Sequence, residues 1–295
     1  MADDPRAAAP SPLDQAGEFY GATPRFNLES SLARRREEMA RHGAMALLLE
    51  ELRGVFPSGE IGSALEVGGE YATTLSLLAG RFRIGSATSC DLIVPAHRIE
   101  GIRYVAAPAE TLRATFPTGS FDLVLLIDVI EHLYDPDRVL DEVRAVLKPA
   151  GVLALVTPNL ASWLNRLLLV GGHMPLDMEV STRRIFGRPG PRDGPPAGHI
   201  RVFTLRALHE FLAFHGYRVR ASGTAPLGFS HATYVAADGG TLATDPTRPT
   251  GRDGPLLRSM LAIDRVMARA VPSMGSRIVT VASADGRPPP AAPVA

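Results

Sequence analysis

Residues 121–157 alternate between two buried-strand patterns and one amphipathic helix. The run 121–127 (FDLVLLI) is almost continuously apolar, and the run 151–157 (GVLALVT) has the same character. Between them, residues 137–147 place their apolar side chains on one side of a helix. Strands that are apolar on both faces and alternate with helices are typical of a parallel sheet covered on both sides. This stretch therefore predicts an α/β fold.

The rest of the chain extends the alternation. A helical pattern covers residues 27–56, and Gly43 divides it into two helices. The further predicted strands are 63–67, 83–88, 102–106, 217–221 and 276–282, and the further predicted helices are 73–79, 204–215 and 256–270. We predict an α/β, Rossmann-like, seven-stranded and mostly parallel sheet with helices on both faces.

Composition excludes several classes of function. The chain of 295 residues has 31 basic and 31 acidic side chains, so no global charge favours nucleic acid or an anionic membrane as a partner. Lys148 is the only lysine and precedes Pro149, which excludes a phosphate-binding P-loop. Cys90 is the only cysteine, which excludes an intramolecular disulfide and a multi-cysteine zinc site. With no signal-peptide pattern and no membrane-spanning run, we expect a cytoplasmic protein.

Two motifs follow predicted strands directly. Glu66-Val-Gly68-Gly69 ends the strand 63–67, and Asp128, Glu131 and His132 follow the strand 121–127. In open α/β sheets, ligands bind at the carboxyl ends of the strands, where glycines allow close approach of the backbone. The alternative is structural: the glycines form a simple turn, the two acids cap the next helix, and His132 packs beneath it.

The segment from about residue 64 to 219, with the final strand SRIVTVA, resembles a class I S-adenosylmethionine-dependent methyltransferase of the small-molecule group. The resemblance rests on LEVGG, on FPTGSFDLVLLIDVIEHLYDPDRVLDEVRAVLKPAGVLALVTPN and on GHIRVFTLRALHEFLAFHGYRV. It implies S-adenosylmethionine as cofactor and a small-molecule acceptor. It also implies cofactor-binding roles for a set of residues after the first four strands, which are Glu66, Gly68, Gly69, Asp91, Ala109 and Asp128.

Several positions depart from the family pattern. Glu70 and Ala72 stand where the family has its second and third glycines. The acid expected after the second strand, near Thr88, comes three residues later as Asp91, and Pro108 replaces the acid that follows the third strand. These departures keep a second hypothesis open, a non-methylating or degenerate relative that serves as a partner subunit or as a repurposed enzyme.

Catalysis of methyl transfer needs a nucleophile and often a base. His132 and His199 are the candidate bases, and a loop-anchoring hydrogen bond is the alternative role for His199. The family analogy favours O-methylation in a bacterial biosynthetic pathway. The spacing Asp128-x-x-Glu131-His132 also resembles the magnesium-associated site of quinone-biosynthesis catechol O-methyltransferases. We nevertheless expect no metal, because histidine is an unusual Mg²⁺ ligand and non-metal relatives carry a similar Glu-His.

The predicted organisation has one main domain with flanking segments. Residues 1–12 and 287–295 are expected to be disordered, residues 13–60 to form an N-terminal helical lid, and residues 61–286 to form the methyltransferase domain. Within that domain, the glycine- and proline-rich residues 171–198 are expected to form a flexible lid loop. The arginines of this loop either attract an acidic acceptor or are simply solvated.

A homodimer is one open alternative for the oligomeric state. A nicotinamide-dependent oxidoreductase is disfavoured, because the GxGxxG spacing is missing.

Overall fold

The computed structural model of the chain describes residues 43–69, 71–96, 98–189, 196–226 and 255–285. Its centre is a seven-stranded sheet with the strand order β3-β2-β1-β4-β5-β7-β6. The strands are β1 (Glu60–Val67), β2 (Arg83–Asp91), β3 (Ile102–Ala106), β4 (Phe121–Ile127), β5 (Leu147–Pro158), β6 (Tyr217–Ala225) and β7 (Arg277–Ala284). β1 to β5 pair in parallel, whereas β7 pairs antiparallel with both β5 and β6. The predicted seven-stranded, mostly parallel sheet is confirmed.

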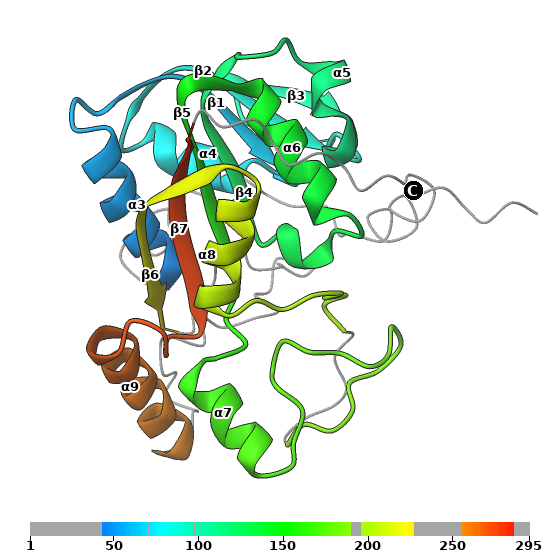
Figure 1. Cartoon of the computed structure of the whole chain (residues 1–295), viewed down its shortest axis with the longest axis vertical. Coiled ribbons are helices and arrows are strands. Elements are labelled where there is room, and N and C mark those ends of the chain that lie inside the picture. Colours follow the sequence, from blue (N-terminus) through cyan, green and yellow to red (C-terminus); the bar gives the residue numbers. More distant parts are fainter. Residues whose placement is uncertain (1–42, 70, 97, 190–195, 227–254, 286–295) are drawn as a thin grey trace, which may run out of the picture.

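Helices cover both faces of this sheet (Figure 1). The helices of the described residues are α3 (Gly43–Val55), α4 (Thr73–Ala79), α5 (Leu112–Thr115), α6 (Pro136–Val146), α7 (Trp163–Val170), α8 (Leu205–Phe214) and α9 (Pro255–Ala270), with the short 3-10 turns η1 (Ala109–Thr111) and η2 (Ile130–His132). Of these, α7 and α9 lie beyond one end of the strands and do not cover a face (Figure 1). Apolar residues of α3 and α4 pack on one face, and those of α5, α6 and α8 pack on the other. β4 serves both cores, since Leu123, Leu125 and Ile127 face the first and Val124 and Leu126 face the second.

The strand order reverses between β1 and β4, and this reversal fixes the place of the site. β2 and β3 lie on one side of β1, and β5 and the antiparallel pair lie beyond β4. In sheets of this kind a crevice opens at the reversal, beyond the carboxyl ends of the two central strands. A Cβ added to Gly68 would lie 2.6 Å from Val129 Cγ2, so the segments that leave β1 and β4 are in close contact there.

Two local expectations are wrong. β2 continues through Asp91 instead of ending at residue 88. Its last residues are polar and give no strand pattern in the sequence, but they pair with β1 as far as Val67 and Cys90. Asp91 is therefore the last residue of β2. The alternative in which Asp128 and Glu131 cap the next helix is also wrong, because Asp135 caps α6 by accepting the amide of Arg138 at 2.9 Å.

The predicted N-terminal lid is described only over α3. That helix packs against β6 and β7, and Met45, Leu48 and Leu52 belong to the core. The remainder of the lid, residues 13–42, lies outside the described residues, as do the termini 1–12 and 287–295. Within the described part of the chain, no helix is long and apolar enough to cross a membrane.

Candidate active site

Asp128 leaves the carboxyl end of β4 in an unusual backbone conformation. Its φ is 52°, in the left-handed region that side chains other than glycine rarely adopt. Its carboxylate accepts a hydrogen bond from Arg277 Nη1 at 3.0 Å, and both side chains are mostly buried. Left-handed backbone at a non-glycine residue is concentrated at functional sites. The ion pair joins the end of β4 to the start of β7, two strands away.

Glu131 is a fully buried carboxylic acid on η2. Its Oε2 accepts a hydrogen bond from the Thr157 hydroxyl at 2.9 Å, whereas Oε1 is buried without a hydrogen-bond partner among the described residues. Burial in the protein interior, followed by the negative charge of Asp128, raises the pKa of Glu131 to about 8. Glu131 is therefore protonated at neutral pH and can donate or accept a proton close to that range.

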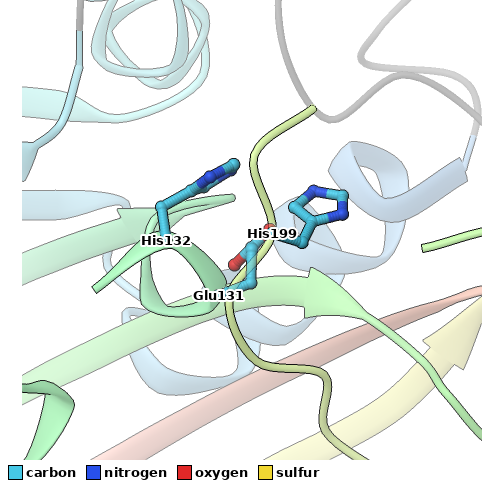
Figure 2. A group of neighbouring side chains, drawn as sticks. All are labelled: Glu131, His132 and His199. Atoms are coloured by element: carbon cyan, nitrogen blue, oxygen red, sulfur yellow. The ribbon is translucent and has the colours of Figure 1, made fainter. Parts of the chain in front are cut away.

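His132 and His199 face each other beside this acid. Their ring centroids are 4.8 Å apart, and Figure 2 shows the Glu131 carboxylate between the two rings. The Nδ1 atom of His132 lies 3.1 Å from the carbonyl of Gly198, and that of His199 lies 3.0 Å from the carbonyl of Asp177. The structure therefore brings together two bases predicted from segments 67 residues apart. His199 makes the loop-anchoring contact that was its alternative role.

Glu131, His132 and His199 offer one ligand atom each within 4.8 Å of one another. Asp128, the third ligand in the magnesium alternative, pairs with Arg277 instead of joining this group. Two imidazoles with one carboxylate are not the oxygen-rich set that Mg²⁺ prefers. The expectation of no metal stays a prediction.

The glycine turn after β1 forms a tight cradle beside the end of β2. A Cβ on Gly69 would lie 2.7 Å from Ser89 Oγ and 2.8 Å from Glu66 Cγ, so any larger residue there would force one of these side chains to shift. Ser89 Oγ is buried without a hydrogen-bond partner among the described residues. Bare backbone next to an unpartnered hydroxyl is an arrangement that a polar ligand can complete.

Residues 33–222 match the family model of a methyltransferase domain. The match covers more than half of the chain. The chain belongs to this methyltransferase domain family. The resemblance predicted from the strand-four motif is thereby confirmed.

Individual relatives cover less of the chain than the family model does. A probable S-adenosylmethionine-dependent methyltransferase of Mycolicibacterium smegmatis is 27% identical over 195 residues, which are 60% of this chain and 66% of that protein. A ubiquinone biosynthesis O-methyltransferase of Chromobacterium violaceum is 27% identical over 120 residues, 41% of this chain and 49% of that protein. The chain thus spans less than two thirds of these relatives. A SAM-dependent methyltransferase from Archaeoglobus fulgidus aligns in structure with a TM-score of 0.45 at 14% identity, over 81% of this chain and 93% of that one.

The family implies S-adenosylmethionine as cofactor, and the methyltransferase residues at the glycine turn fit it. Gly68 and Gly69 leave the backbone bare, and the unpartnered Ser89 hydroxyl lies beside them. Asp91 stands at the end of β2, and Ala109 opens η1 after β3; the cofactor-binding roles of both residues stay predictions. Glu66 has a second role here, because its buried Oε2 accepts the amide of Leu75 in α4 at 3.0 Å.

The structure describes the backbone at two positions that depart from the family pattern, Ala72 and Pro108, but not at Glu70. Ala72 adopts φ 56° at the start of α4, so it takes the backbone conformation for which glycine is better suited. Pro108 precedes η1 in an extended conformation and offers no acceptor side chain. Glu70 lies outside the described residues.

The sequence did not predict three residues of this candidate site. Arg277 neutralises Asp128 from β7, Thr157 donates to Glu131 from β5, and Glu179 binds the segment that carries His199. A single arginine at the start of a mostly apolar strand was the available signal for Arg277. The other two carry no local signal, because their contacts join residues 20 to 26 positions apart.

Proposed function

We propose that the chain transfers a methyl group from S-adenosylmethionine to a hydroxyl oxygen of a small molecule with a catechol or related phenol ring. The observation that carries this proposal is the cluster of one protonated, partly unpartnered acid and two imidazoles at the carboxyl end of β4. A hydroxyl nucleophile needs a base to receive its proton, and imidazole is suited to that task near neutral pH. Several relatives are ubiquinone biosynthesis O-methyltransferases, which supports oxygen as the acceptor atom.

Each residue has a defined task in this reaction. When bound, S-adenosylmethionine would supply an electrophilic methyl group to the acceptor oxygen. Gly68 and Gly69 admit the cofactor to the backbone. His199 takes the hydroxyl proton, and His132 lies across from it to orient the same hydroxyl. Glu131 in its protonated form avoids adding a second negative charge next to Asp128, which is already balanced by Arg277.

The first experiment measures whether the chain binds the cofactor. Isothermal titration of the full chain with S-adenosylmethionine and S-adenosylhomocysteine should show binding of both. The absence of heat from either ligand, up to millimolar concentration, contradicts the proposal. Mass spectrometry then follows methylation of 3,4-dihydroxybenzoate and, for comparison, of 3,4-diaminobenzoate, and a gain of one methyl on the diol alone supports oxygen transfer.

The role of His199 as the base is tested by comparing it with a histidine outside the site, His209. His199→Gln should lower turnover by about 10²- to 10⁴-fold, the usual contribution of a positioned general base. His209→Gln, on α8 and bonded to Ser222 Oγ at 2.9 Å, should leave turnover unchanged. Equal turnover of both variants and of wild type would remove His199 from the mechanism.

The second candidate function is a degenerate relative that does not transfer methyl groups. It is favoured by Ala72, whose strained backbone stands at a family glycine, and by Glu66, whose carboxylate is bonded to the Leu75 amide. Restoring Ala72→Gly tests it by the same calorimetry. If S-adenosylhomocysteine binds only to the restored protein, the natural chain is a degenerate binder.

A further inference from the structure

Glu179 lies inside the segment that carries His199. Its Oε1 accepts the amide of Ala197 at 2.7 Å, and its Oε2 accepts the amides of Gly198 at 2.7 Å and His199 at 3.3 Å. The Glu179 side chain is only 6% exposed, although it belongs to a loop. Three successive backbone amides that converge on one point form an anion-binding concavity. Here the bound anion is a side chain of the same loop.

The backbone at Gly198 produces this concavity. Its φ is +82°, in the left-handed region where glycine carries no steric penalty. A left-handed residue between two others turns successive amides toward a common centre, and Glu179 occupies that centre. The sequence Ala197-Gly198-His199 therefore has the residue types that the Glu179 contact requires.

Arg188 gives the buried carboxylate an opposite charge. Its Nη2 lies 3.5 Å from Glu179 Oε1, and its Nη1 donates to the carbonyl of Leu176. The Arg188 side chain is 15% exposed. A mostly buried carboxylate that lost its partners would carry a large desolvation cost, so these contacts hold one another in place.

The other side of the same segment is bound to η2. The amides of Ile200 and Arg201 donate to the carbonyl of Glu131 at 2.8 Å and 3.1 Å. The backbone at His199 thus lies between two attachments, Glu179 on its N-terminal side and Glu131 on its C-terminal side, and its Nδ1 contacts the Asp177 carbonyl at 3.0 Å. The first attachment is made through a side chain and can be removed by a single substitution.

We propose that Glu179 is a positioning residue that sets the place of the His199 imidazole opposite His132. The proposal rests on the proposed function, in which His199 receives the acceptor proton. Glu179 touches neither reacting group, and it acts through the backbone of residues 197–199. A displacement of about 1 Å in a base is enough to lower a rate by about 100-fold, so this contact matters for the reaction.

The first test needs no acceptor. Imidazole signals of the full chain, labelled with ¹³C at histidine, are compared between wild type and Glu179→Gln, with His199→Gln to assign the signal of interest. The His199 signal should shift or broaden, while the affinity for S-adenosylhomocysteine stays within about twofold of wild type. The surface variant Glu210→Gln, on α8, should move no signal of His199. An unchanged His199 signal in Glu179→Gln overturns the proposal.

A second variant guards against a folding defect. Glu179→Asp keeps the charge and shortens the side chain by one methylene, so it should displace the His199 signal less than Glu179→Gln does. If circular dichroism shows that Glu179→Gln is unfolded, Glu179→Asp carries the test alone. An unchanged His199 signal in a folded Glu179→Asp protein then overturns the proposal.

The second test is a double-mutant cycle on turnover of 3,4-dihydroxybenzoate. Glu179→Gln should lower kcat by about 10- to 100-fold with the KM for S-adenosylmethionine unchanged. In the His199→Gln background, the same substitution should cause no further loss, because both changes remove one function. An equal loss in both backgrounds overturns the positioning role. If no methyl transfer occurs at all, the proposed function fails, and the imidazole signals still decide whether Glu179 positions His199.

Discussion

Replacing Glu131 by glutamine should change how the stability of the protein depends on pH. The pKa of this buried carboxyl rises from 4.5 to about 8 in the folded state. Between these values the folded protein binds a proton that the unfolded chain has released, so wild-type stability falls as pH rises. The whole range corresponds to about 5 kcal/mol, and the part between about pH 5 and pH 9 to about 4 kcal/mol.

The glutamine variant isolates this contribution. Its amide keeps the size of the side chain and can still accept the Thr157 hydroxyl, but it does not titrate. The free energy of unfolding is measured by urea denaturation of both proteins from about pH 5 to pH 9, with a chelator present. Relative to wild type, Glu131→Gln should gain about 4 kcal/mol of stability across this range. The exposed α8 variant Glu210→Gln is the control, and its curve should stay parallel to that of wild type.

Parallel curves for wild type and Glu131→Gln would refute the reasoning. They would mean that the folded protein ionises Glu131 as readily as the unfolded chain does. In that case the buried oxygen that lacks a partner among the described residues must be solvated, and the two imidazoles would stand beside a carboxylate rather than an acid. A variant curve that falls more steeply than wild type would contradict the sign of the shift.

Three further variants test the glycine turn, the ion pair and the packing of α7. Gly69→Ala should weaken S-adenosylhomocysteine binding by at least about tenfold in calorimetry and lower stability by about 1 to 3 kcal/mol through overpacking, whereas Gly54→Ala, with open space around it, should do neither. Arg277→Met should cost about 3 to 5 kcal/mol in urea denaturation, and adding Asp128→Asn should recover much of that loss, because the buried negative charge that Arg277 balances is then removed as well. Trp163→Phe should lower stability by about 1 to 2 kcal/mol, because its indole bond to a buried α9 carboxylate is lost.

The sequence alone predicted the order and type of most elements, but it did not predict the short helix α5. Strand 121–127 and helix 73–79 are found with the predicted bounds, because long apolar runs and strong periodicity depend on local patterns of burial. The end of β2 was missed for the opposite reason. Its last residues are polar, and they form a strand because β1 and β3 lie on either side of them.

The sequence predicted only some of the residues that come together in the site. The motif predicted that Asp128, Glu131 and His132 stand together at the end of one strand, because a strand and its following turn are local. It could not show that Arg277 is the partner of Asp128, or that His199 lies beside His132. These pairs are separated by 149 and 67 positions in the chain.

The sequence by itself determined the family, the parallel sheet and the strand ends at which chemistry can occur, since these depend on patterns within a few residues. Only the tertiary structure decided the protonation and charge states of the groups in the site. A pKa is set by burial and by charges within a few ångströms, and both arise when distant strands and loops pack together. Because of that packing, the pKa of Glu131 is raised and its carboxyl is protonated at neutral pH. The same packing lets the Glu179 carboxylate accept the backbone amide of His199.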